Sequence, residues 1–217
     1  MNSIIRIIRR PFFNDRSYNV VFWLIGINVV IFLLAQILGP EIRHRMYMYL
    51  SMIPAAVMSG WVWTFITYMF MHADFGHVFF NMFGLFIFGL QVENRMGSKE
   101  FLLYYLVTGA LAGVFSFVMY YLTGNYVVFL VGASGALYAV QLAFAVFNPH
   151  AVIYIWGILP LRAPVMVLVF TVLSLMFIVT GRGGNVAHLT HLAGFAFGWL
   201  YFMLRFGINP WRRLTGR

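Results

Sequence analysis

The chain has no cysteine, so neither disulfide bonds nor thiolate metal ligands can contribute to its fold. Charged residues are scarce as well: they make up 9% of the 217 residues, against roughly 25% in soluble domains. Hydrophobic residues account for 63% of the chain, and the mean hydropathy is +0.88. A soluble fold could not bury that much apolar surface. The composition therefore predicts an integral membrane protein.

Acidic residues are the next scarcity. The sequence has five, against fourteen lysines and arginines, which gives a formal net charge of +9. Such an excess can indicate nucleic-acid binding, but the basic residues lie in short clusters beside apolar segments and form no single basic face. We therefore expect the chain to interact with the lipid bilayer and with no nucleic acid.

Six apolar segments are candidates to cross the membrane as helices, which takes roughly 20 residues each. The alternating pattern of a membrane barrel is absent, so helices are the only way to satisfy the backbone in lipid. The sequence predicts an all-α polytopic membrane protein, a six-transmembrane-helix bundle with a long interfacial first loop. The expected spans are 20–38, 77–92, 101–122, 134–147, 165–180 and 192–206. We expect residues 1–217 to form one membrane domain, with a short basic segment at 1–19 and a basic tail at 207–217.

The basic residues predict the orientation of the spans. Six crossings leave both termini on one side, and eleven basic residues fall on that side: Arg6, Arg9, Arg10, Arg16, Arg95, Lys99, Arg162, Arg205, Arg212, Arg213 and Arg217. Three fall on the opposite side: Arg43, Arg45 and Arg182. By the positive-inside rule, we expect a multi-pass protein of the cell (plasma) membrane with both termini cytoplasmic.

Two stretches depart from simple spans. Residues 39–76 are rich in Met, Trp and Tyr, and we expect them to form short amphipathic helices in the outer interface. Residues 127–131 are apolar, but Gly132 and Gly135 bracket Ser134. If a helix begins near Ser134, the segment before it enters the membrane without helical structure. Such backbone is tolerated only where protein or a water-filled cavity lines it.

Polar groups inside a membrane are candidates for function. His77 and Asn81 are four residues apart and share one helix face, and Ser134 and Tyr138 share another. The helices that begin near Ser134 and His191 carry small residues that would let their backbones approach closely: Gly135, Gly194 and Gly198. A hydrogen bond between that serine and that histidine requires such an approach.

Three motifs contain these residues: His72-Ala73-Asp74-Phe75-Gly76-His77-Val78-Phe79-Phe80-Asn81, Gly132-Ala133-Ser134-Gly135 and His191-Leu192-Ala193-Gly194. Together they resemble the motifs of the rhomboid family of intramembrane serine proteases, and the resemblance runs from the first expected span to the sixth. One position departs from the family pattern. The first loop of the family commonly has Trp-Arg, and here Trp63 is followed by Thr64.

The resemblance implies that Ser134 is the nucleophile and His191 the general base. It assigns supporting roles to four further residues: His77 and Asn81 in the oxyanion hole, Tyr138 against the catalytic histidine, and His72 as a histidine of structural role. It also implies that the substrates are single-span membrane proteins with small residues at the cleaved bond and a helix-weakening segment nearby.

The residues support a dyad without reference to the family. None of the carboxylates lies inside an expected span, so no acidic third member is expected behind His191: Asp15, Glu41, Asp74, Glu93 and Glu100. His191 would take the Ser134 proton as the serine attacks a peptide carbonyl, and would return it to the leaving amine. Asn81, His77 and the Ser134 backbone N–H would bind the oxyanion.

Other classes of function make different demands on the sequence. A catalytically idle, client-binding relative of these proteases would not need both members of the dyad, and this chain keeps both. A transporter or proton path would be expected to have carboxylates within its spans or paired broken helices, and the sequence shows neither. A zinc peptidase would need His-Glu-x-x-His and an aspartyl peptidase a membrane aspartate, and both are absent. We therefore expect neither a cofactor nor a metal.

The last loop is rich in glycine. Gly181-Arg182-Gly183-Gly184-Asn185-Val186 joins the final two expected spans shortly before His191. Its three glycines predict a mobile cap that admits water and substrate, and a tight turn is the alternative.

Overall fold

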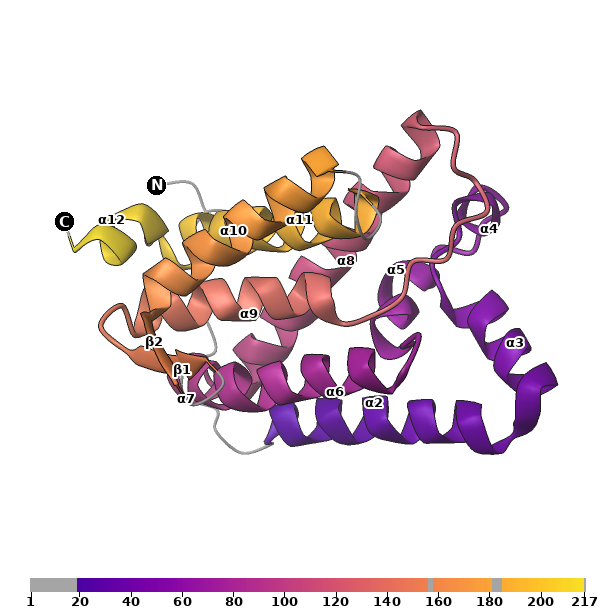
Figure 1. Cartoon of the computed structure of the whole chain (residues 1–217), viewed down its shortest axis with the longest axis horizontal. Helices are drawn as coiled ribbons and strands as arrows, with labels where there is room; N and C mark the ends of the chain where they lie inside the picture. The colour runs from indigo at the N-terminus through magenta and orange to yellow at the C-terminus, as the bar shows by residue number, and fades with distance from the viewer. Residues whose placement is uncertain (1–18, 156–157, 181–184, 217) are drawn as a thin grey trace, which may run out of the picture.

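The computed structural model describes residues 19–155, 158–180 and 185–216. Most of the long helices run along one direction in a bundle (Figure 1). In the described residues, four helices are long and apolar enough to cross a membrane: α2 (Val20–Ile37), the continuous helix Phe75–Met96, α8 (Ser98–Leu122) and α10 (Ala163–Thr180). A shorter apolar helix, α9 (Ser134–Phe147), lies among them. The chain is thus a mostly helical multi-span membrane protein.

Two of the helices contain wider turns. The Phe75–Met96 helix consists of α6 (Phe75–Gly84), the π-helical turn η2 (Leu85–Gly89) and α7 (Leu90–Met96). Near the C-terminal end of the chain, α11 (Asn185–Tyr201) continues into the π-helical turn η3 (Phe202–Phe206), and α12 (Pro210–Thr215) follows.

The helix α11 begins at Asn185, about two turns before the residue 192 that the sequence predicted. The predicted span leaves out residues 185–191, which include the polar residues Asn185, His188, Thr190 and His191. One of them, Thr190, is buried, and its hydroxyl hydrogen-bonds that of Ser116 in α8 at 2.6 Å. A polar turn that is satisfied inside the bundle can therefore be part of a membrane helix.

One element corrects the all-α prediction. The strands β1 (Val152–Ile155) and β2 (Leu159–Arg162) form an antiparallel hairpin in which Val152 pairs with Arg162. Helix α9 stops before Asn148-Pro149, and the residues that follow are mainly β-branched or aromatic, which favours a strand. The chain is mostly helical, but it is not all-helical.

The first loop contains short helices, as expected: α3 (Gly39–Leu50), α4 (Pro54–Met58), α5 (Thr64–Thr67) and η1 (Tyr68–Phe70). The Trp61 ring stacks on Tyr49 at 5.0 Å and on Trp63 at 5.4 Å between ring centroids. Trp63 Nε1 donates a hydrogen bond to the Tyr49 carbonyl, and Thr64 Oγ1 donates one to the Trp61 carbonyl. The loop is thus anchored through Trp63 although threonine, not arginine, follows it.

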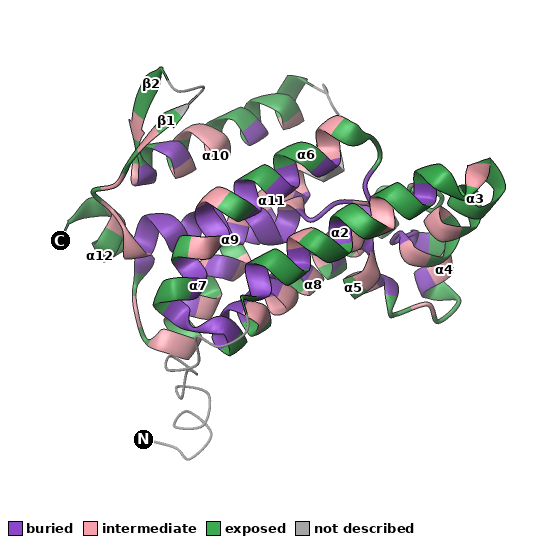
Figure 2. Ribbon diagram, turned by 90° about the horizontal axis from the view of Figure 1, so that it is seen from below, coloured by how far each residue is buried: buried purple, intermediate pink, exposed green. Residues whose placement is uncertain are grey.

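Helix α9 lies at the centre of the bundle, and almost all of its residues are buried (Figure 2). Its closest neighbour is α11. A Cβ atom added at Gly194 would lie 2.1 Å from the Gly135 carbonyl oxygen, and one added at Gly198 would lie 3.2 Å from the Ala139 Cα. The backbones of α9 and α11 are therefore in direct contact at these glycines.

Two buried carboxylates join helices at one end of the bundle. Glu93 accepts the backbone N–H groups of Val20 and Val21 at 2.8 and 2.9 Å, which satisfies the first turn of α2. Glu100, at the start of α8, is fully buried and accepts hydrogen bonds from Arg205 Nε at 2.8 Å and from the Tyr201 hydroxyl. Both carboxylates are thus engaged in holding helices together.

Replacing Gly194 by alanine should destabilise the protein, because the added methyl group must push α11 away from α9. We expect the free energy of unfolding to fall by about 1–3 kcal/mol, measured by thermal unfolding of the purified protein in detergent. Gly26→Ala is the matched control: Gly26 lies inside α2, and no atom lies within 4 Å of the Cβ that it would gain. Equal loss of stability in the two variants would contradict the close contact of α9 and α11.

Candidate active site

Ser134 is the first residue of α9, and the chain before it is not helical. Leu130 exchanges two backbone hydrogen bonds with Met52, and the Gly132 N–H donates to the Tyr68 carbonyl at 3.0 Å. Gly132 has a φ of +108°, a conformation that side chains disfavour, and a Cβ atom there would lie 2.5 Å from His77 Nε2. The segment that leads to Ser134 is therefore held between the first loop and α6.

Ser134 and His191 are in hydrogen-bond contact across α9 and α11. The distance between His191 Nε2 and Ser134 Oγ is 2.8 Å. His191 lies in the second turn of α11, one turn before Gly194, so the glycine contact between the helices brings the two side chains together. When Nε2 accepts the serine proton, Nδ1 carries the ring hydrogen.

The His191 ring is oriented by other rings. It stacks on Tyr138 with centroids 4.3 Å apart and an interplanar angle of 15°, and His188 meets it edge-on at 5.8 Å. Among the described residues, the buried Nδ1 of His191 has no hydrogen-bond partner. The position of the His191 ring is thus set by packing against neighbouring rings.

His77 and Asn81 lie on α6, beside the non-helical segment 127–133 that leads to Ser134 (the serine loop). Asp74 caps this helix by accepting the His77 backbone N–H at 2.8 Å, and the His77 ring faces Gly132. Asn81 is buried, and its Nδ2 donates to the His77 carbonyl at 2.9 Å. An amide group has two hydrogens, so a second one can still be donated.

His72 is buried next to His77, with ring centroids 5.0 Å apart. Its backbone carbonyl accepts the Tyr47 hydroxyl of α3. Burial, and secondly the neighbouring His77, lowers the pKa of His72 to about 3, so its imidazole is neutral at physiological pH. His72 therefore fills space at the junction of the first loop and α6 without adding charge.

Sequence reasoning missed several polar contacts around the site. Thr190 precedes His191 and binds Ser116, which joins α11 to α8. The Tyr68 hydroxyl donates to the Gly109 carbonyl at 2.7 Å. The only signal of these contacts in the sequence is a hydroxyl inside an apolar segment, and such hydroxyls often bond their own helix backbone instead.

Two further expectations concern the glycine-rich loop and metal binding. The glycine-rich loop that we expect to act as a cap lies outside them at residues 181–184, so its role stays a prediction. Within the described part of the chain, no three His, Asp or Glu side chains come together as a group that could hold a metal ion.

Comparison with known proteins identifies the family. Residues 59–208 match the Rhomboid domain. The chain is 32% identical to Rhomboid protease GlpG of Haemophilus influenzae, over 81% of this chain and 88% of that protein. It is 31% identical to RHOMBOID-like protein 12, mitochondrial, of Arabidopsis thaliana, over 64% of this chain and 45% of the relative.

A third relative is Rhomboid protein 1, mitochondrial, of Saccharomyces cerevisiae, which is 29% identical over 88% of this chain and 54% of its own length. The chain thus spans about half the length of the two mitochondrial relatives and most of the length of the bacterial protease. A family domain that covers well over half of the chain agrees with the helical bundle and with the three sequence motifs. The chain therefore belongs to the rhomboid family and shares its fold.

Proposed function

We propose that the chain is an intramembrane serine endopeptidase that cleaves transmembrane segments of membrane proteins with a Ser134–His191 dyad. The observation that supports this most strongly is the 2.8 Å hydrogen bond between His191 Nε2 and Ser134 Oγ. A general base within hydrogen-bond reach of a hydroxyl is the arrangement that activates serine as a nucleophile. The relatives in this family include a protein named a rhomboid protease.

We infer the steps of the reaction from the positions of these side chains. His191 Nε2 takes the hydroxyl proton as Ser134 Oγ attacks the scissile carbonyl, and the imidazolium then gives this proton to the leaving amine. In the second step, His191 Nε2 takes a proton from the water that attacks the acyl-enzyme and returns it to Ser134 Oγ as the ester bond breaks. The Tyr138 ring holds the imidazole in place by stacking on it during both steps.

The negative charge of the tetrahedral intermediate needs hydrogen-bond donors. The first-turn amides of α9 have no acceptor within their own helix, and the Ser134 N–H is one of them. His77 next to the serine loop and the second Nδ2 hydrogen of Asn81 supply side-chain donors from α6. Donors of this kind stabilise the transition state more than the ground state.

The length of α9 supports cleavage below the membrane surface. Its 14 residues correspond to a length of about 21 Å, whereas the hydrocarbon core is about 30 Å thick. A helix of this length that reaches one face of the membrane begins below the other face. Ser134, at its start, would then lie at the depth of a transmembrane substrate.

We further propose six transmembrane helices with both termini in the cytoplasm, counting α9 and α11 with η3 as the two spans beyond the four long helices. The elements α7, β2 and α12 lie at one end of the bundle, and α3 lies at the other (Figure 1). The first group carries Arg95, Arg162, Arg212 and Arg213, whereas α3 carries Arg43 and Arg45. The excess of basic residues at the end that holds α12 supports a cytoplasmic C-terminus.

A client-binding protein without activity is the competing function. Such a protein would retain the bundle, but nothing would maintain an aligned serine and histidine. The close contact of Ser134 with His191 and the stacked Tyr138 favour the protease.

Removing either member of the dyad should abolish cleavage. Ser134→Ala and His191→Ala are each expected to lower kcat at least about a thousandfold, and the double variant should be scarcely worse, because the two residues act as one unit. Cleavage of tagged single-span membrane proteins in reconstituted vesicles measures this. Ser59→Ala and His150→Ala change exposed residues and serve as controls with unchanged cleavage. Substantial cleavage by the Ser134 variant would refute the proposed nucleophile.

Asn81→Ala should lower kcat about a hundredfold to a thousandfold with little change in KM, because an oxyanion donor acts on the transition state. His77→Ala should resemble it. Asn28→Ala is the matched control, since Asn28 is also buried and its Nδ2 also donates to the carbonyl four residues earlier, at 2.8 Å. If Asn81→Ala raised KM and left kcat unchanged, Asn81 would position the substrate and would not bind the oxyanion.

The proposed orientation predicts which reporter fusions are active. A fluorescent protein fused to the C-terminus should fluoresce, and alkaline phosphatase inserted after the exposed Gly60 in the first loop should be active outside. Alkaline-phosphatase activity from the C-terminal position would show that the assigned orientation is wrong.

A further inference from the structure

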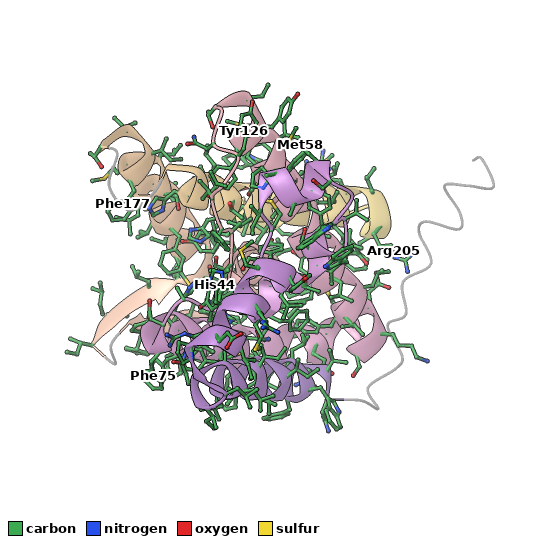
Figure 3. All side chains as sticks on the ribbon, turned by 90° about the vertical axis from the view of Figure 1, so that its right-hand side faces the viewer. His44, Met58, Phe75, Tyr126, Phe177 and Arg205 are labelled. Carbon is green, nitrogen blue, oxygen red and sulfur yellow. The ribbon has the colours of Figure 1, made fainter. Side chains whose placement is uncertain are left out.

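A cavity of about 940 Å³ opens between α2, α3 and the start of α6. Its polar lining includes Arg43, His44 and Tyr47 of α3 and Asp74 at the start of α6. Figure 3 looks onto the end of the molecule that carries α3 and labels His44, one of these lining residues. Neither Ser134 nor His191 lines the cavity, so it is separate from the proposed catalytic dyad.

An apolar groove continues from this cavity. The groove has a volume of about 260 Å³ and runs between α2 and α6, where its walls are aliphatic and aromatic side chains such as Leu33 and Phe83. Phe32 and Phe75 line both the cavity and the groove, so the two are contiguous. Because α2 and α6 belong to membrane-spanning helices, the groove points along the spans and the polar cavity lies at their end.

The polar part contains charges of both signs. The Arg43 guanidinium donates to the neutral amide of Gln36 at 3.1 Å, whereas Arg45 pairs with Glu41 at 2.6 Å. Asp74 brings a carboxylate to the same cavity, and one of its oxygens accepts the His77 N–H. Arg43, Tyr47 and Asp74 all line this cavity.

We propose that the cavity and groove bind one phospholipid of the bilayer, a zwitterionic one whose headgroup carries an ammonium. Its phosphate lies at Arg43, its ammonium at Asp74, and one acyl chain lies in the groove between α2 and α6. An arginine and a carboxylate that line the same cavity complement a headgroup that carries a phosphate and an amine. An anionic lipid would match Arg43 but would be repelled by Asp74.

The occupied site would support the start of α6. Asp74 caps this helix, and the Tyr47 hydroxyl binds the His72 carbonyl just before it. A bound headgroup would therefore contact the two residues that hold the segment His72–Phe75 in place. Lipid binding itself does not depend on the proposed protease activity, and it can be measured on the purified chain.

Native mass spectrometry of the detergent-purified protein can test the site with three lipids of identical acyl chains: phosphatidylethanolamine, phosphatidylcholine and phosphatidylglycerol. Phosphatidylethanolamine should bind about tenfold more tightly than phosphatidylcholine, whose methylated nitrogen cannot donate a hydrogen bond to Asp74. It should also bind more tightly than phosphatidylglycerol. Equal binding of the three lipids, or a preference for phosphatidylglycerol, would overturn the proposal.

Two pairs of variants locate the site. Arg43→Gln should weaken the binding of all three lipids about tenfold, whereas Arg45→Gln, two residues along the same helix, should leave it unchanged.

Asp74→Asn should remove the preference for phosphatidylethanolamine over phosphatidylcholine and keep the helix cap, because asparagine also caps helices. Should this variant fail to fold, stepwise N-methylation of the lipid amine tests the same contact on the unaltered protein. Identical effects of Arg43→Gln and Arg45→Gln would place the lipid elsewhere.

Discussion

The contact between the backbones of α9 and α11 at Gly135 and Gly194 is the constraint on which the rest of the site depends. Lipid tails are as apolar as leucine, so membrane helices gain little from burying apolar side chains against each other. Close backbone contact and hydrogen bonds between helices must hold them instead. At Gly194 even one methyl group would overlap the Gly135 carbonyl, and this closeness allows two short side chains to meet.

Hydrogen bonds to α8 also hold α9 and α11 in place. The Tyr104 hydroxyl donates to the Ala139 carbonyl of α9 at 2.6 Å, and Ser116 binds Thr190 of α11. The helix α8 is thereby joined to both partners, so neither can rotate without breaking a buried polar contact. In the proposed mechanism, this rigidity holds Ser134 Oγ and His191 Nε2 within hydrogen-bond reach before a substrate arrives.

The apolar segments of the sequence predict much of the helical bundle, because length and hydropathy are local properties. The expected helices 134–147 and 20–38 agree with α9 and α2 to within one residue. The start of α11 was misplaced because a hydrogen bond between Thr190 and Ser116 of α8, far away in the sequence, helps to satisfy the polar turn before His191. The hairpin β1–β2 was missed because a segment that is neither long nor strongly apolar carries a weak signal.

In the candidate site, too, local features could be predicted from the sequence, whereas contacts between distant segments could not. A four-residue spacing places His77 and Asn81 on one helix face, and this requires no knowledge of tertiary structure. The 2.8 Å contact between Ser134 and His191 depends on how two helices cross, and the sequence indicates it only through small residues and the resemblance to a family. The cavity beside Arg43 and Asp74 could not be inferred, because it depends on where α3 lies relative to α6.

The most direct test of the dyad is to locate the serine that reacts with a fluorophosphonate. The purified protein would be labelled in detergent, digested, and sequenced by tandem mass spectrometry. If Ser134 is the nucleophile and His191 its base, the adduct will be on Ser134, and the His191→Ala variant will lose it. An adduct on another buried serine, such as Ser116 or Ser174, or undiminished labelling of the His191 variant, would contradict the dyad.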